Sequence, residues 1–331
     1  MRAFIITELE ANQRFDKYLR KFFKNTGSGY VYKMLRKGTI KLNGKKVKGN
    51  EIIKAGDEVR MYMTDETIDE YTGKYQEAVP EFREYKQAYK KYKERIEIIY
   101  EDKHILLINK PIGILSQKAE KTDVSCNEWL IGYMLRTEAI TPQQLQTFKP
   151  SICNRLDRNT SGILICGKTL AGSQKMNELI KERKIRKFYR TFVKGCFDQE
   201  VRTSGYLKKD YFTNKVSVSE TVTDGSERIE TVFTPIKWKE NISYIEVELV
   251  TGKTHQIRAH IASLGHPVLG DYKYGDRKFN ESETRKRHQL LHAYRLEMPY
   301  IDDDKFQHLS RKVFVAEEPI YYETIKARMK K

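Results

Sequence analysis

Two helical patterns and several strand-like patterns of apolar residues occupy the first 63 positions. Apolar residues recur at helical spacing twice, at Phe15, Leu19, Phe22, Val31, Met34 and Leu35. Gly38 follows the second pattern, where a glycine commonly ends a helix. The stretch TIKLNGKKV predicts a strand, a turn at Asn43–Gly44 and a returning strand, and AGDEVRMYM predicts a further turn and strand. The pattern predicts a compact module over residues 1–63.

Residues 64–95 mix acidic residues, lysines and tyrosines, and we interpret them as a linker. Tyr85, Tyr89 and Tyr92 recur at helical spacing among lysines. Such a stripe either stacks on nucleic-acid bases beside a basic groove or docks a helix onto a neighbouring domain. We favour the docking interpretation.

A larger domain is predicted over residues 96–331, where strand and helix patterns alternate irregularly. IEIIY, HILLIN, ILIC, KFYRTFVKG, KVSVS and YIEVELV read as strands. Ser125 and Glu128 have the spacing of a capping box, and a helical pattern follows them. A second helix is predicted from Leu170 to Ile180. This order predicts an α+β domain with a mixed sheet.

Composition and charge add a class of partner to this picture. Hydrophobic residues make up 39% of the 331 residues, which is enough for a packed core. The net charge is +17, and residues 1–63 hold fifteen Lys and Arg against six Asp and Glu. A basic surplus concentrated in one module favours nucleic acid as the partner. No apolar run has the length of a signal-peptide core or a membrane span, and the four cysteines are widely spaced, so we expect a cytoplasmic protein without a disulfide framework.

The stretch NRLDRNTSG, residues 154–162, places one carboxylate between two arginines. Arg155 and Arg158 flank Asp157 and favour its ionised form. An ionised carboxylate acts as a nucleophile or base in some proteins and forms an ordinary structural ion pair in others. These nine residues alone favour the ion pair.

A second group of polar residues lies in TGKTHQIRAHIASLGHPVLGDYKYG, residues 251–275. Thr254 is predicted to cap a helix that ends near Gly265, with His255 and Arg258 three positions apart on one face. The spacing of the histidines does not suit a zinc site, so no metal is predicted. Arg258 is better suited to pair with a buried carboxylate.

Taken together, these segments resemble the RluA family of pseudouridine synthases. NRLDRNTSGILICGKT is similar to the family's catalytic motif, and TGKTHQIRAHIASLGHPVLGDYKYG is similar to its second hallmark. KPIGIL, KFYRTFVKG and LHAYRLEMPY match three further family segments in the same order. The N-terminal module resembles the S-four-type (alpha-L) RNA-binding domain, and this layout is closest to the RluC/RluD-like branch, which modifies large-subunit ribosomal RNA.

The resemblance implies a fold and a reaction. The fold is the pseudouridine synthase fold, an α+β domain over residues 96–331 with a mixed, largely antiparallel sheet and flanking helices, after the alpha-L domain at 1–63. The reaction isomerises uridine to pseudouridine in RNA, with no cofactor and no metal. Two positions depart from the family pattern, which commonly has His at Asn154 and Arg at Lys253; these departures bear on substrate fit more than on catalysis.

The resemblance also implies roles for individual residues. Asp157 is expected to be the catalytic carboxylate, Arg258 its ion-pair partner, and Tyr189 the ring that stacks on uracil. Arg155 is expected to fill the space of the flipped base, and Arg158 to contact phosphate or form a surface ion pair. The remaining expected substrate-binding residues are Lys253, His255, Ile257 and Leu291; core packing explains Ile257 and Leu291 equally well. The expected RNA-binding residues of the module are Arg14, Lys17, Arg36, Lys37, Lys45 and Lys46.

Large-subunit ribosomal RNA is the expected partner, and the protein is expected to be a monomer that does not bind membranes. Three alternatives remain open at this stage. The first is a synthase that acts on transfer RNA. The second is a non-catalytic ribosome assembly factor, which would not need the Asp157–Tyr189–Arg258 set. The third is a nucleoside or glycoside hydrolase, which usually needs two paired carboxylates.

Overall fold

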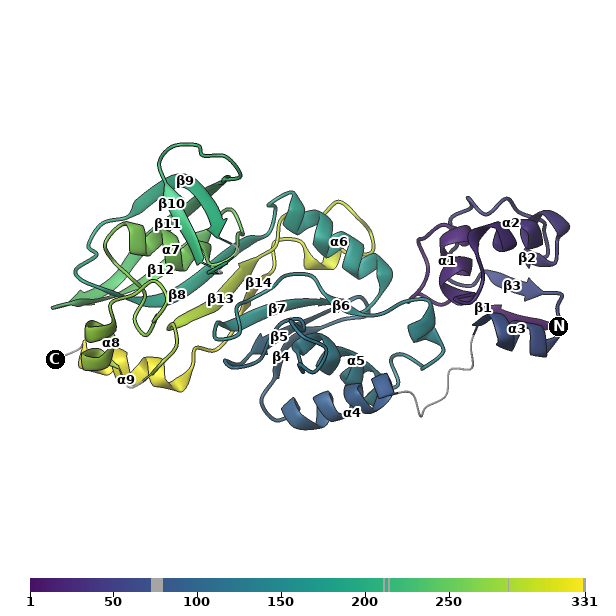
Figure 1. Cartoon of the computed structure of the whole chain (residues 1–331), viewed down its shortest axis with the longest axis horizontal. Helices are drawn as coiled ribbons and strands as arrows, with labels where there is room; N and C mark the ends of the chain where they lie inside the picture. The colour runs from purple at the N-terminus through teal and green to yellow at the C-terminus, as the bar shows by residue number, and fades with distance from the viewer. Residues whose placement is uncertain (73–79, 211, 214, 285, 330–331) are drawn as a thin grey trace.

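The computed structural model describes residues 1–72, 80–210, 212–213, 215–284 and 286–329. A small N-terminal module lies at one end of the molecule, and a larger body built on a long sheet forms the rest (Figure 1). Among the described residues, no helix combines the length and the apolar character needed to cross a membrane.

The N-terminal module combines a small antiparallel sheet with three helices. Its elements are β1 (Arg2–Ile5), α1 (Phe15–Phe22), α2 (Ser28–Lys37), β2 (Ile40–Leu42), β3 (Glu58–Met61) and α3 (Asp65–Thr72). The strand order is β1-β3-β2. The turn at Asn43–Gly44 forms, but the chain returns for a single pair, Leu42 with Lys45, rather than as a strand, and β2 pairs with β3 along its length. The carboxylate of Glu51 accepts the backbone N–H groups of Lys48 and Gly49, so these donors are not offered to a neighbouring strand.

The hydrophobic core of the module extends beyond residue 63. Ile68 on α3 is fully buried among the side chains of α1, α2 and the sheet. Helix α3 therefore packs with the module, although its residues fall in the predicted linker. Residues 73–79 of that predicted linker lie outside the described residues.

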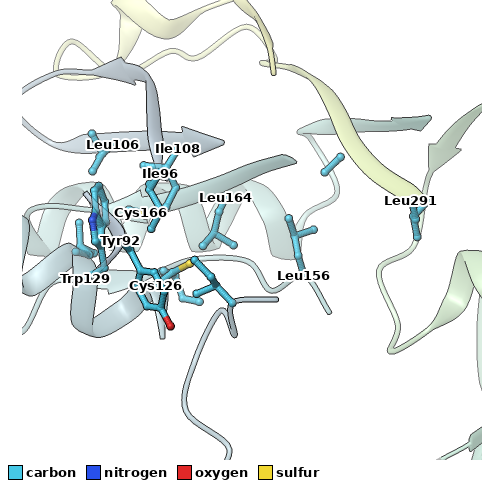
Figure 2. Packing of buried hydrophobic residues seen from close by; sticks show 14 of the residues in the cluster. Tyr92, Ile96, Leu106, Ile108, Cys126, Trp129, Leu156, Leu164, Cys166 and Leu291 are labelled. Atoms are coloured by element: carbon cyan, nitrogen blue, oxygen red, sulfur yellow. The ribbon is translucent and has the colours of Figure 1, made fainter. Parts of the chain in front are cut away.

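The end of the same segment packs onto the larger body. Helix α4 (Pro80–Tyr92) lies against α5 (Cys126–Arg136). Tyr85 and Tyr92 are buried, and the ring of Tyr89 lies 6.4 Å from that of Trp129. Figure 2 shows Tyr92 and Trp129 in the cluster that covers the strands. The docking interpretation of the tyrosine stripe is confirmed.

A mixed sheet with flanking helices forms the larger body, as predicted. In the described part of the chain it has eleven strands, in the order β10-β9-β11-β12-β8-β13-β7-β5-β4, with β14 beside β13 and β6 beside β7. Their bounds are β4 (Glu97–Glu101), β5 (Ile105–Lys110), β6 (Ser151–Ile152), β7 (Ser161–Gly167), β8 (Arg186–Lys194), β9 (Val201–Asp210), β10 (Lys215–Ser219), β11 (Glu227–Lys239), β12 (Ile242–Leu249), β13 (Leu291–Glu297) and β14 (Val313–Val315). The pairing of β13 with β7 is parallel, and the other pairings are antiparallel.

Glycine allows the parallel pair to approach closely. Gly162 has φ +109°, and a Cβ there would lie 2.2 Å from the carbonyl oxygen of Ala293 on β13. This close contact sits at the start of β7, directly after NRLDRNT, so it fixes the sheet position from which that loop departs.

Helices cover both faces of the sheet. Its alternating strand residues split between two cores, with Leu106 and Leu164 facing α4 and α5, and Ile105 and Ile163 facing α6. The remaining helices of the body are α6 (Leu170–Lys181), α7 (Gln256–Ser263), α8 (Arg277–Glu283) and α9 (Ile320–Arg328), with short 3₁₀ turns at Gln144–Gln146 and Gln307–Leu309. The capping box of Ser125 and Glu128 is present at the start of α5.

The start of α7 differs from the prediction that Thr254 caps it. The N-cap residue is His255, whose φ of 54° is left-handed, and α7 begins at Gln256. The side chain of Gln256 accepts the N–H of Lys253 at 3.1 Å and the hydroxyl of Thr251 at 2.9 Å. These bonds curl the preceding loop and place His255, rather than Thr254, at the helix start.

Hydrogen bonds join the module to the body along the segment after β1. The N–H of Leu170 donates to the carbonyl of Leu9 at 3.1 Å. The hydroxyl of Thr147 donates to the carboxylate of Glu10, which is buried, at 3.0 Å.

Candidate active site

Two loops brace each other around Asp157, and a buried lysine joins them. Lys110 is fully buried at the end of β5, and its Nζ donates to the carbonyls of Pro111 at 3.1 Å, Ile114 at 2.9 Å and Arg158 at 3.1 Å. Burial lowers the pKa of Lys110 to about 8. Three N–H donors meet three carbonyls, so the charged amine ties the Lys-Pro-x-Gly turn to the residue after Asp157.

The side chains of Ser116 and Asn154 fix the backbone just before Asp157. Ser116 Oγ donates to the carbonyl of Leu156 at 2.8 Å and accepts the N–H of the same residue at 2.9 Å. Asn154 Oδ1 accepts the N–H of Ile165 at 2.7 Å. Asn154, one of the two departures from the family pattern, thus holds the loop to β7.

A single arginine joins Asp157 to a second carboxylate. Arg258 Nη1 donates to Asp157 Oδ2 at 2.9 Å. Its Nε and Nη2 donate to the two oxygens of Asp271 at 2.7 and 3.0 Å, a bidentate arrangement. Burial would raise the pKa of Asp271, but the hydrogen bonds and charge of Arg258 outweigh burial and lower it. The guanidinium therefore has a fixed anionic partner on one side and presents its remaining edge to Asp157.

The expected pair of Asp157 and Arg258 forms, whereas Asp271 was not predicted as its second partner. Asp271 is 1% exposed, while the Asp157 side chain is 28% exposed. A signal was present in the sequence: Asp271 follows the helix that carries Arg258, between two glycine-containing turns.

His255 and Tyr274 lie on the other side of Asp157. His255 Nε2 is 3.8 Å from Asp157 Oδ2, and its Nδ1 is 2.8 Å from the hydroxyl of Tyr274. That hydroxyl also accepts the N–H of Val216 on β10. Burial lowers the pKa of His255, and the charge of Asp157 opposes this only in part. His255 is thus held as a neutral ring beside the carboxylate.

Tyr189 on β8 is buried close to Asp157. Burial, and then the charge of Asp157, raises its pKa well above the usual value. Its phenol stays protonated at neutral pH and offers an aromatic face and one O–H donor. Ile257 and Leu291 are also buried and belong to the main hydrophobic core, as the packing interpretation predicts, and their contact with a substrate stays a prediction.

All nine residues expected at the site of the body line one open cleft of about 890 Å³: Arg155, Asp157, Arg158, Tyr189, Lys253, His255, Ile257, Arg258 and Leu291. Among the described residues that line it, Asp157 is the only carboxylate. Nine Lys and Arg side chains of the described residues line it, including Lys181 at the end of α6, Arg183 in the turn that follows and Lys187 on β8. A lone acid in a strongly basic cleft suits chemistry on a polyanion.

The two arginines of NRLDRNTSG, Arg155 and Arg158, are both exposed. Arg158 Nη2 lies 3.8 Å from Asp123 Oδ1, a surface ion pair of the kind expected for it. Lys253 is paired with Glu227 at the edge of the cleft.

The six basic residues expected to bind RNA in the module are all exposed. Arg14 contacts Asp16, a residue that the sequence did not single out. Asp16 is 1% exposed and also accepts from Arg20 at 3.3 Å and from the hydroxyl of Tyr32 at 2.6 Å. Burial opposes its charge, yet these hydrogen bonds lower its pKa. Asp16 therefore fixes two arginines and a tyrosine on one surface of α1 and α2.

Among the described residues, no group of three or more His, Cys, Asp or Glu side chains is placed to hold a metal ion.

Comparison with known proteins gives a consistent family. The family model described as RNA pseudouridylate synthase matches residues 104–263. The ribosomal large subunit pseudouridine synthase C of Vibrio cholerae is 32% identical over 276 residues, which is 83% of this chain and 81% of that one. The protein of the same name in Escherichia coli K12 is 30% identical over 304 residues, 89% of this chain and 88% of that one.

Solved structures share the fold of the body. Human RNA pseudouridylate synthase domain containing 4 superimposes with a TM-score of 0.58 at 18% identity, covering 75% of this chain and 97% of that one. Human RNA pseudouridylate synthase domain containing 1 gives a TM-score of 0.50 at 21% identity, covering 71% and 96%.

Proposed function

Since the chain belongs to the RNA pseudouridine synthase family and is an RNA-modifying isomerase, we propose that it converts uridines of large-subunit ribosomal RNA to pseudouridine, with Asp157 as its catalytic carboxylate and without a cofactor. The observation that carries this proposal concerns the described residues that line the cleft: Asp157, paired with Arg258, is the only carboxylate among nine Lys and Arg side chains.

The reaction needs no net change in oxidation state. The N1–C1′ bond of uridine breaks, the uracil rotates, and a C5–C1′ bond forms. The proton on C5 leaves to solvent, and N1 of the product carries a proton. Asp157 starts the sequence by adding to C1′ or to the uracil ring, or by removing a ribose proton, and each route needs the ionised carboxylate.

The neighbours of Asp157 suit this role. Arg258 holds the carboxylate in position, because Asp271 fixes the opposite edge of its guanidinium. Tyr189 lines the cleft and provides an aromatic ring on which uracil stacks. Its phenol hydroxyl stays protonated and can donate a hydrogen bond.

The target base must leave its RNA stack to reach Asp157, at a cost of a few kcal/mol. Arg155 is exposed at the mouth of the cleft, two residues from Asp157. Its planar guanidinium is suited to occupy the space that the base vacates.

Two features support ribosomal RNA as the substrate. The relatives from Vibrio cholerae and Escherichia coli are named ribosomal large subunit pseudouridine synthase C. The Vibrio parahaemolyticus protein of that name aligns over 92% of this chain, so the similarity extends into the N-terminal module. The exposed basic residues of that module supply phosphate contacts, and we propose that it acts as an S-four-type RNA-binding domain.

Release of tritium tests the proposal. Ribosomal RNA from cells that lack this gene, labelled with tritium at C5 of uridine, is incubated with purified enzyme. We expect tritium to pass into water with the wild type and not with Asp157→Asn, while both bind the RNA. Release of free uracil would indicate a hydrolase, and release from transfer RNA alone would contradict the ribosomal substrate.

A further inference from the structure

Several cations of the active-site cleft already have a carboxylate partner within the protein. Arg258 pairs with Asp157 and Asp271, Lys253 with Glu227, Arg158 with Asp123, and Lys118 with Glu84. These contacts pair four of the nine Lys and Arg side chains that line the cleft in the described part of the chain.

Lys187 on β8 is different. It is half-buried, and among the described residues no carboxylate lies within 4 Å of its Nζ and no acceptor lies within hydrogen-bond distance. The Nζ lies beside the loop before α7, where a Cβ on Gly252 would be 3.6 Å from it. Lys187 is therefore an ammonium group removed from much of its water without a protein partner in return.

Burial of this charge is unfavourable. Burial, and then repulsion by Arg183, lowers the pKa of Lys187. The buried Lys110 shows how this fold satisfies an amine that serves structure, since its Nζ has three carbonyl acceptors. An unsatisfied amine in a cleft is instead available to an anionic ligand.

The position of Lys187 identifies the anion. Lys187 precedes Tyr189 by two residues on β8, so both side chains point to the same face of the sheet, roughly 6.6 Å apart along the strand. Both line the cleft that contains Asp157. A nucleotide whose base stacks on Tyr189 carries its phosphates on the same ribose, which brings one of them within reach of Lys187.

We propose that Lys187 binds a backbone phosphate of the RNA next to the uridine that stacks on Tyr189. This inference rests on the proposed function and adds a substrate contact to it. Arg183 lines the same cleft and adds a second positive charge to the phosphate site. The contact fixes the ribose relative to Asp157, so it positions the bond that breaks.

The test combines a protein change with a change in the RNA. Lys187→Met is compared with wild type on a fragment of large-subunit ribosomal RNA that contains a modified uridine located by mapping. Matched fragments carry an uncharged methylphosphonate at the linkage 5′ or 3′ to that uridine. Lys184→Met is the control, because Lys184 is exposed and pairs with Glu182 at 2.8 Å.

Lys187→Met is expected to lower kcat/KM ten- to hundred-fold on the natural fragment, the range for a hydrogen bond to a charged group. One methylphosphonate should lower kcat/KM of the wild type and of Lys184→Met similarly, and should have little further effect on Lys187→Met. Independent, multiplicative losses at both linkages would overturn the assignment of Lys187.

Thermal unfolding separates this role from a structural one. Removal of a half-buried, unpaired ammonium should leave the Tm of Lys187→Met unchanged or higher. A lower Tm together with equal losses on all fragments would mean that Lys187 only supports the fold. If the wild type modifies no uridine in any RNA, the proposed function itself fails, and this result differs from either outcome for Lys187.

Discussion

Arg258 connects the Asp157 carboxylate to the interior of the protein. Its guanidinium bonds Asp157 at one edge and the almost fully buried Asp271 at the other. The bidentate side fixes the arginine, and the single bond on the other side leaves Asp157 partly exposed to a substrate. We therefore regard Asp271 as a positioning residue that acts through Arg258.

Replacing Asp271 by Asn tests this role. The change leaves Arg258 without its buried counter-charge, and loss of one member of a buried ion pair costs about 3–5 kcal/mol of folding stability. We expect a lower free energy of unfolding and at least a roughly tenfold lower kcat. Asp276→Asn is the matched control, because Asp276 caps α8 at the surface, where a cap contributes about 1 kcal/mol. Equal activity in the two variants would contradict the assignment.

The free energy of unfolding should depend on pH differently in wild type and in Asp271→Asn. The folded-state pKa of Asp271 is lowered, so its stabilising contribution is complete above the unfolded pKa of about 3.9. That contribution is lost as the pH falls below this value and through the folded pKa. Chemical denaturation between neutral pH and pH 3 should show a steeper loss for wild type than for Asp271→Asn. Parallel curves would indicate that Asp271 is not held as an anion.

For single residues, the sequence predicted the roles of those marked by motifs and missed the roles that depend on packing. Asp157 and Arg258 stand in recognisable motifs, and the structure brings them to 2.9 Å. Asp271 and Lys187 also lie in segments that match the family, but those segments gave them no role, because their importance depends on which groups surround them. Burial and the absence of a partner cannot be read from residue order.

Among the elements, the loop that carries Asp157 owes its position to the turn after β5. Lys110 and Ser116 reach across from this turn to the backbone on both sides of Asp157. The loop is thus fixed to the sheet edge where β7 and β13 run parallel.

Lys110→Met should weaken this brace. Methionine keeps much of the side-chain volume, but it cannot donate the hydrogen bonds that the carbonyls of Pro111 and Ile114 accept from Lys110. We expect a loss of about 1–3 kcal/mol in the free energy of unfolding and a lower kcat. Lys278→Met on the exposed surface of α8 is the control. An active variant of wild-type stability would show that the loop holds its position without Lys110.

At helices α1 and α2, a buried carboxylate likewise holds several side chains in place. Asp16 binds Arg14, Arg20 and Tyr32, so Asp16→Asn should release both arginines from a common acceptor. We expect weaker RNA binding in a filter or polarisation assay while tritium release at saturating RNA is retained. Glu58→Gln, which alters only the neighbouring pair with Arg60, is the control. Unchanged affinity in Asp16→Asn would exclude this surface from RNA binding.

The strands and helices were largely predictable, and their ends were less so. Alternation and helical spacing predicted β4, β5, β7, α5 and α6 because each buries one regular set of apolar residues. After the predicted turn at Asn43–Gly44 only Lys45 pairs back, and Thr254 does not cap α7. Side chains of Glu51 and Gln256 capture the backbone groups that the simpler patterns would use.

In the whole molecule, we propose that the module supplies affinity and the cleft supplies chemistry. The segment after β1 is bonded to the body at Leu9 and Glu10, so the basic surface is carried on a docked module. Phosphate contacts made there should respond to salt more strongly than the chemical step.

Salt dependence measures this division. Replacing Arg36, Lys37, Lys45 and Lys46 together by Gln removes four exposed cations of the module. The slope of log affinity against log salt should become shallower by up to roughly 0.7–0.9 for each RNA phosphate that these cations no longer neutralise. A control with Arg277, Lys278, Arg311 and Lys312 replaced should keep the wild-type slope, because these exposed cations lie on the body. Identical slopes in both variants would contradict an RNA-binding role for the module.

The central claim is that Asp157 carries out pseudouridine formation in large-subunit ribosomal RNA. The most direct measurement maps pseudouridine in ribosomal RNA from cells that lack the gene and are supplied with either wild type or Asp157→Asn at equal abundance. The account predicts specific sites that wild type restores and Asp157→Asn leaves as uridine. Restoration of the same sites by Asp157→Asn would contradict it.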